Sequence, residues 1–142
     1  MSSLRTLDSN GIWAPADRGP LLLAGDSSDI PMIRRILTAL PTGSYGQVIV
    51  EVFNATQIQS LPATQHLGVN WLFREGQASH ERTNAAALKG EPLARAIEAW
   101  LAEWMPTDED TLGDRSLWIG ARTNPRIERL CREIDRRFSR SA

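Results

Sequence analysis

Residues 21–31, LLLAGDSSDIP, decide the fold of this chain, because an apolar run there meets a glycine, an acid and two serines before a proline. A short continuous apolar run is typical of a strand that is covered on both faces. The residues that follow place apolar side chains on one helical stripe, with Ser28 as the expected N-cap and Pro31 in the first turn. The stretch therefore predicts a buried strand that leads into a helix.

The same alternation of strand and helix continues along the chain. QVIVEVF at 47–53 is rich in β-branched residues, and GVNWLFR at 68–74 and SLWIG at 116–120 are two further apolar runs. An amphipathic helix is predicted between the last two, and a closing helix begins at Pro125 with Asn124 as its N-cap. The expected apolar face of the first of these helices consists of Leu93, Ile97, Trp100, Leu101 and Trp104.

Strands that alternate with helices imply right-handed crossovers and a parallel sheet. We therefore predict the α/β class, as a Rossmann-like three-layer sandwich with a mainly parallel sheet of about four strands. The folded domain is expected to span residues 19–142. Residues 1–18 are polar and rich in Ser, Asp, Gly and Pro, and they predict a flexible N-terminal arm.

Composition and charge exclude several classes of function. Sixteen Lys and Arg against seventeen Asp and Glu give a net charge of -1, so nucleic acid is not an expected partner. No segment approaches the roughly 20 apolar residues of a membrane span, and a cytoplasmic location is predicted. His66 and His80 have no second ligand at metal spacing, so neither a metal site nor a catalytic residue is predicted. Cys131 lies beside a helical apolar stripe and is expected in the core.

The expected site lies where the strands end. In an open parallel sheet all strands end along one edge, and ligands bind in the crevice there. Glycine, hydroxyl and arginine side chains, together with the amides that open the first helix, suit an anion. The negative charges of Asp26 and Asp29 oppose anion binding, and the glycines do not follow the GxGxxG pattern. An ordinary capped turn therefore remains the alternative. The candidate cofactor-binding residues are Gly25, Asp26, Ser27, Ser28, Asn54, Arg74, Gly120 and Arg122.

Three stretches resemble the C-terminal domain of the siderophore-interacting protein family, which is related to the ferredoxin-reductase-like flavoenzymes. They are APADRGPLLLAGDSSDIPMIRRILTALPTG at 14–43, GQVIVEVFNATQIQSL at 46–61 and VNWLFRE at 69–75. The family's turn, AGDETALPA, falls on residues 24–32 and keeps the glycine, the aspartate and the proline. The family's fourth strand ends in Trp-x-Ala-Gly-Glu, whereas residues 118–122 read WIGAR, so the glycine is displaced and an acid has become a base.

The resemblance implies an NAD(P)H-dependent ferric-siderophore reductase, in which a flavin-binding barrel precedes the nucleotide-binding domain. It also implies a role for Arg74, which resembles the arginine that related reductases set against the 2′-phosphate of NADP. The stretch before Ala14 is too short for the barrel, so NADPH or NADH is an expected cofactor and FAD on this chain is not. The chain alone would then be at most half of a reductase.

Two functions from different classes follow. The first is a stand-alone NAD(P)H-binding module linked to ferric-siderophore reduction and iron acquisition, with a flavoprotein or a ferric siderophore as partner. The second is a degenerate interaction module that no longer binds nucleotide and forms a homodimer through Trp100 and Trp104. Arginines on the last helix could supply cations to a siderophore, although a solvated helix face explains them as well. These arginines are Arg132, Arg136, Arg137 and Arg140.

Overall fold

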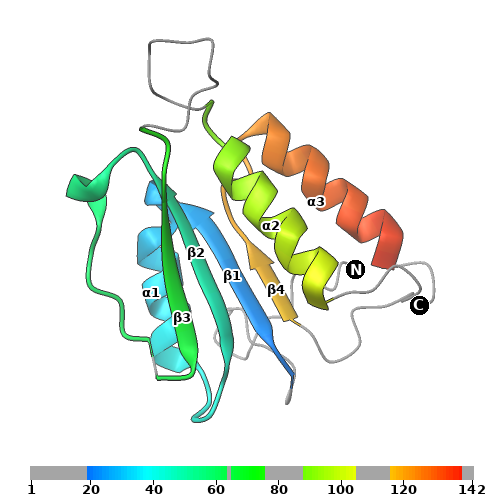
Figure 1. Ribbon diagram of the computed structural model, residues 1–142. Coiled ribbons are helices and arrows are strands. Elements are labelled where there is room, and N and C mark those ends of the chain that lie inside the picture. The colour runs from blue at the N-terminus through cyan, green and yellow to red at the C-terminus, as the bar shows by residue number, and fades with distance from the viewer. Residues whose placement is uncertain (1–18, 64, 76–87, 105–115, 139–142) are drawn as a thin grey trace.

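The computed structural model describes residues 19–63, 65–75, 88–104 and 116–138. Four strands form one sheet in the order β3-β2-β1-β4, and every neighbouring pair is parallel. The strands are β1 (Leu21–Asp26), β2 (Gly46–Val52), β3 (Leu67–Phe73) and β4 (Ser116–Ile119). The helices are α1 (Ile30–Ala39), α2 (Glu91–Trp104) and α3 (Pro125–Phe138), with short 3-10 turns η1 (Ser27–Asp29) and η2 (Ala55–Gln57). The predicted α/β class and parallel sheet are confirmed (Figure 1).

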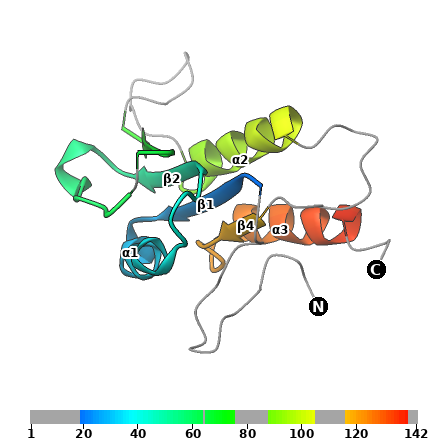
Figure 2. The ribbon, with the colours of Figure 1, turned by 90° about the horizontal axis from the view of Figure 1, so that it is seen from below.

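The helices form two layers around the sheet. Helix α1 covers one face, and α2 and α3 lie side by side over the other (Figures 1 and 2). The chain moves outward from β1 to β2 and β3 and then returns to the opposite side of β1 to form β4. The strand order therefore reverses between β1 and β4, and this reversal is the position where open α/β sheets bind ligands.

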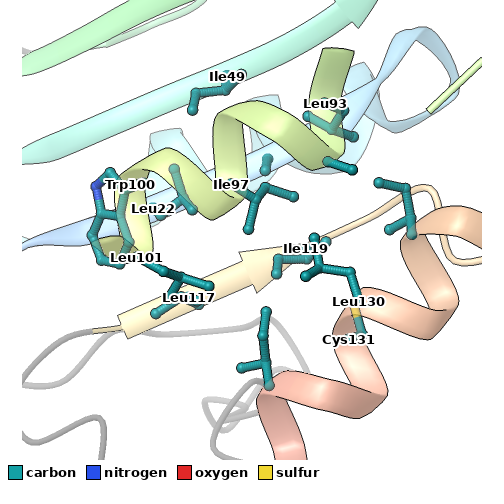
Figure 3. Close-up of a cluster of buried hydrophobic side chains, with 14 of the residues drawn as sticks. Leu22, Ile49, Leu93, Ile97, Trp100, Leu101, Leu117, Ile119, Leu130 and Cys131 are labelled. Carbon is teal, nitrogen blue, oxygen red and sulfur yellow. The ribbon is translucent and has the colours of Figure 1, made fainter. Parts of the chain in front are cut away.

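Each face of the sheet has its own apolar core. All six residues of β1 are buried, which explains their continuous apolar pattern, because the strand is central and covered on both faces. On the side of α2 and α3, Leu22 and Leu117 pack with Ile97, Trp100 and the buried Cys131 (Figure 3). The expectation that Cys131 is a core residue is confirmed.

Trp100 and Trp104 differ in their burial. Trp100 is buried, whereas Trp104 is 37% exposed at the end of α2. Their rings are stacked with centroids 6.2 Å apart. Trp104 is therefore only partly the core residue that its helical spacing predicts.

The residues that cap the helices correct one prediction and confirm another. Ser28 is not the N-cap of a helix; instead, the Asp26 side chain caps η1 by accepting from the Ser28 amide at 2.9 Å, and α1 begins at Ile30. The aspartate is favoured because its carboxylate reaches the amide two residues ahead. Asn124 does cap α3, since its Oδ1 accepts from the amides of Arg126 and Ile127.

Several predictions fall outside the described residues. They concern the arm at 1–18, His80 and Arg140. Within the described part of the chain, none of the helices has the length and apolar character needed to cross a membrane.

Candidate functional site at the carboxyl edge of the sheet

The sheet brings the eight predicted residues to one edge, but in two groups. Gly25 and Asp26 end β1, and Gly120 follows β4, where its amide donates to the Ala24 carbonyl at 2.7 Å. Arg74 follows β3, and its amide donates to the Val52 carbonyl at 3.0 Å. Neighbouring strands lie about 4.8 Å apart, so the ends of β3 and β4 are separated by about 14 Å. The edge can therefore hold an extended ligand but not one small pocket made by all eight residues.

A carboxylate that the sequence did not single out as a site residue lies between the ends of β1 and β4. Asp29 Oδ2 accepts hydrogen bonds from the Asp26 amide at 3.0 Å and from the Ala121 amide at 2.8 Å. Asp26 in turn accepts from the amide of Ser28 and from its hydroxyl, at 2.9 and 2.6 Å. The amide of Ser28, at the helix start that the sequence offered to an anion, is therefore already paired with a carboxylate of the chain, and so are the amides of Asp26 and Ala121.

Burial raises the pKa of Asp29 above its ordinary value, and the nearby negative charge of Asp26 acts in the same direction. The two backbone amides that donate to Asp29 lower its pKa and partly offset this increase. The turn is thus an acidic one, in which a half-buried carboxylate depends on amide donors for its stabilisation.

Two glycines make room for the Asp29 side chain. A Cβ atom at Gly120 would lie 2.5 Å from Asp29 Cγ, and a Cβ atom at Gly25 would lie 2.8 Å from Asp29 Cβ. The related family motifs, as placed on this sequence, have alanine at both position 29 and position 120. The glycine at 120 is therefore explained by the aspartate at 29, because a larger residue at 120 would overlap the carboxyl group.

The displaced glycine of the family motif also has a structural counterpart. Ala121 stands where that motif has glycine, and it adopts a φ of 56°, which is a left-handed conformation. Such a conformation costs a residue with a Cβ roughly 1 to 2 kcal/mol. The turn therefore keeps a backbone conformation that is typical of glycine, although residue 121 is an alanine. The amide of Ala121 donates to Asp29.

At the other half of the edge, Arg74 is already engaged with residues of β2. Its Nε lies 3.5 Å from Glu51 Oε2, and its guanidinium lies 5.5 Å from the centroid of the Phe53 ring. Its ion-pair partner in the structure is thus an acid of the neighbouring strand β2. The Arg74 side chain is 23% exposed, so it still reaches the surface at the end of β3.

Glu51 is the second carboxylate that the sequence analysis missed. It is 2% exposed, and it accepts from the Gly90 amide at 2.9 Å and from the Leu93 amide at 3.0 Å. These amides open α2, so a strand residue caps a helix that starts 40 residues later in the chain. The available signal was the single acid in QVIVEVF, because a charge in a buried strand needs partners.

The remaining predicted residues make local contacts. Asn54 caps η2 by accepting from the amide and hydroxyl of Thr56, at 3.1 and 2.6 Å. Arg122 donates from Nε to Glu128 Oε1 at 2.9 Å, and this hydrogen bond raises the pKa of Arg122 despite the opposing effect of burial. Among the residues that the structure describes, no cluster of His, Cys, Asp and Glu could hold a metal ion.

The fold defines the class: an open parallel α/β sheet with a glycine-containing turn at the edge where sheets of this class bind ligands. Comparison with protein families narrows this class. The model of the siderophore-interacting protein family matches residues 19–119, and the chain belongs to that family. The resemblance seen in the sequence is thereby confirmed.

The chain is also similar to individual proteins and solved structures. Uncharacterized proteins of Mycobacterium tuberculosis and Mycobacterium bovis are 38% identical over 82 residues, which cover 56% of this chain and 29% of each relative. A siderophore utilization protein from T. fusca has a similar structure, with a TM-score of 0.56, 26% identity, and coverage of 86% of this chain and 41% of that one. The siderophore-interacting protein of Acinetobacter baumannii shares the fold at a TM-score of 0.56 and 14% identity. The chain thus spans less than half the length of these relatives.

Proposed function

We propose that this chain is the NAD(P)H-binding part of a system that reduces ferric siderophores. The observation that carries the proposal is the parallel sheet itself, whose strand order reverses between β1 and β4 and which brings Arg74 to the same carboxyl edge. Membership of the siderophore-interacting protein family supports the link to iron acquisition.

The residues of the edge fit an extended nucleotide in part. Arg74 would pair with the 2′-phosphate of NADPH, since a guanidinium binds phosphate through parallel hydrogen bonds. Its contacts with Glu51 and Phe53 would hold the guanidinium in place before the ligand arrives. The turn at 26–29 fits a phosphate less well, because its amides donate to Asp26 and Asp29.

When bound, NAD(P)H would supply a hydride to a flavin held on another domain or polypeptide. The chain's own residues would orient the nucleotide along the carboxyl edge of the sheet, with the 2′-phosphate at Arg74. A ferric siderophore needs no metal ligands from the protein, since the chelator fills the coordination sphere of the iron.

Titration with NADPH and NADH tests the proposal. Trp71 lies three residues before Arg74, and Trp118 lies two residues before Gly120, so intrinsic tryptophan fluorescence reports on both halves of the edge. We expect saturable quenching by NADPH with a dissociation constant between about 1 μM and 1 mM, the range that is usual for enzyme KM values. No saturable change with either nucleotide at millimolar concentration would contradict the proposal.

A second function is favoured by the capping of the helix starts. Asp26, Glu51 and Asn124 respectively cap η1, α2 and α3, so each of these turns has its amides bound within the chain. An interaction module would retain such an edge without a ligand, and the exposed Trp104 would contribute to its contact surface. Loss of nucleotide binding together with a dimer that Trp104→Ala dissociates would favour this function.

A further inference from the structure

The Asp29 side chain fills the crevice between β1 and β4 almost as a ligand would. Its Oδ2 receives one amide from the β1 side, Asp26 at 3.0 Å, and one from the β4 side, Ala121 at 2.8 Å. The bond to Asp26 is one half of the capping box of η1, and the bond to Ala121 ties this turn to the residues that follow β4. The anion at this position is therefore supplied by the chain.

The surroundings show that this placement is built into both strands. Gly25 and Gly120 flank the carboxyl group so closely that a Cβ atom on either would overlap it. Ala121 adopts its left-handed φ of 56° at the residue whose amide donates to Asp29. A freely rotating surface aspartate would impose neither constraint on its neighbours.

We propose that Asp29 acts as an internal anion that excludes phosphate groups from the crevice between β1 and β4. This proposal rests on the proposed function, because it concerns where the phosphates of a bound nucleotide would lie. A second anion at this position would find both amides engaged and would face the charge of Asp29 and of the neighbouring Asp26. The phosphates of a bound nucleotide would then make their contacts at Arg74, away from this turn.

Inorganic pyrophosphate is the probe that tests this directly, since it carries the charge of the nucleotide's phosphates without the nucleotide. The amide signals of Asp26 and Ala121 in a proton–nitrogen correlation spectrum report on this crevice and ignore anions bound elsewhere. At low ionic strength we expect pyrophosphate to leave both signals unmoved in the wild type. In Asp29→Ala both signals should move in a saturable way, with an apparent affinity at least tenfold above any shown by the wild type.

Two further variants separate the causes of that gain. Asp29→Asn keeps an oxygen that can accept the two amides but removes the charge, so we expect a smaller, severalfold gain. Because it retains the capping geometry, it also tests the proposal if Asp29→Ala fails to fold. Glu103→Ala removes the same charge from an exposed position on α2 and should give no gain at these two signals.

The proposal would be overturned if pyrophosphate moved the Asp26 and Ala121 signals of the wild type as strongly as those of the variants. It would also be overturned if folded Asp29→Ala and Asp29→Asn gained nothing, or if Glu103→Ala gained as much as they did. None of these outcomes depends on whether NADPH binds. A failure of the proposed function, seen as absence of nucleotide binding, is therefore distinguishable from a failure of this inference.

Discussion

Glu51→Ala is expected to lower the free energy of unfolding by about 2 to 6 kcal/mol, because two buried amides lose their acceptor and each unpaired group costs about 1 to 3 kcal/mol. The substitution leaves the amides of Gly90 and Leu93 without their acceptor at the start of α2. It also leaves the Arg74 guanidinium without its carboxylate. Since small domains are stable by only about 5 to 15 kcal/mol, the variant should retain little stability at elevated temperature.

Urea unfolding measures this effect, through a lower midpoint at an unchanged m value. Glu51→Gln keeps the size of the side chain and one acceptor, and it should cost less, about 1 to 3 kcal/mol. The matched control is Glu75→Ala, which removes an exposed acid just beyond the end of β3 and should be nearly neutral. A loss below about 1 kcal/mol for Glu51→Ala would contradict the capping role of Glu51.

Arg74→Ala is expected to weaken NADPH about tenfold to a hundredfold and to leave NADH almost unchanged. The two nucleotides differ only in the 2′-phosphate, and a hydrogen bond to a charged group contributes about 1.5 to 3 kcal/mol. Arg74→Lys should recover part of the loss, because an ammonium group cannot reproduce the two parallel bonds of a guanidinium. Calorimetric titration of each variant with both nucleotides measures the difference.

The contact between Arg74 and Glu51 defines the competing outcome. If Arg74 served only to hold the end of β3 against β2, its removal would weaken both nucleotides equally and lower the melting temperature. Arg35→Ala is the matched control, since it removes an exposed arginine from α1. Equal losses of NADPH and NADH in Arg74→Ala would remove Arg74 from the phosphate site.

The layers of the fold could be predicted from the sequence because they depend on local patterns. The unbroken apolar run of β1 indicated a central strand, and Asn124 followed by Pro125 located the start of α3. Ser28 was wrongly chosen as a cap because the four polar residues 26–29 offer several acceptors, and only the geometry selects Asp26. Burial of Trp100 and Cys131 followed from helical spacing.

The interactions across the site could not be predicted in the same way. Glu51 reaches amides about 40 residues away, and Asp29 reaches an amide 92 residues away. Neither pairing leaves a periodic signal, because each depends on how two crossovers place loop amides beside a strand end. The two departures from the family motif, aspartate at 29 and glycine at 120, were visible in the sequence. Their common cause is the close contact between these residues, which only the structure shows.

The central claim is that NAD(P)H binds along the carboxyl edge of this sheet, and the most direct test is amide mapping with isotope-labelled protein. Adding NADPH should move the signals of residues 25–28, Asn54, Arg74 and 120–122 together along one saturation curve. The amide signals at the Trp104 end of α2 should stay unchanged. Absence of shifts along the edge, or shifts confined to the Trp104 end of α2, would contradict the claim.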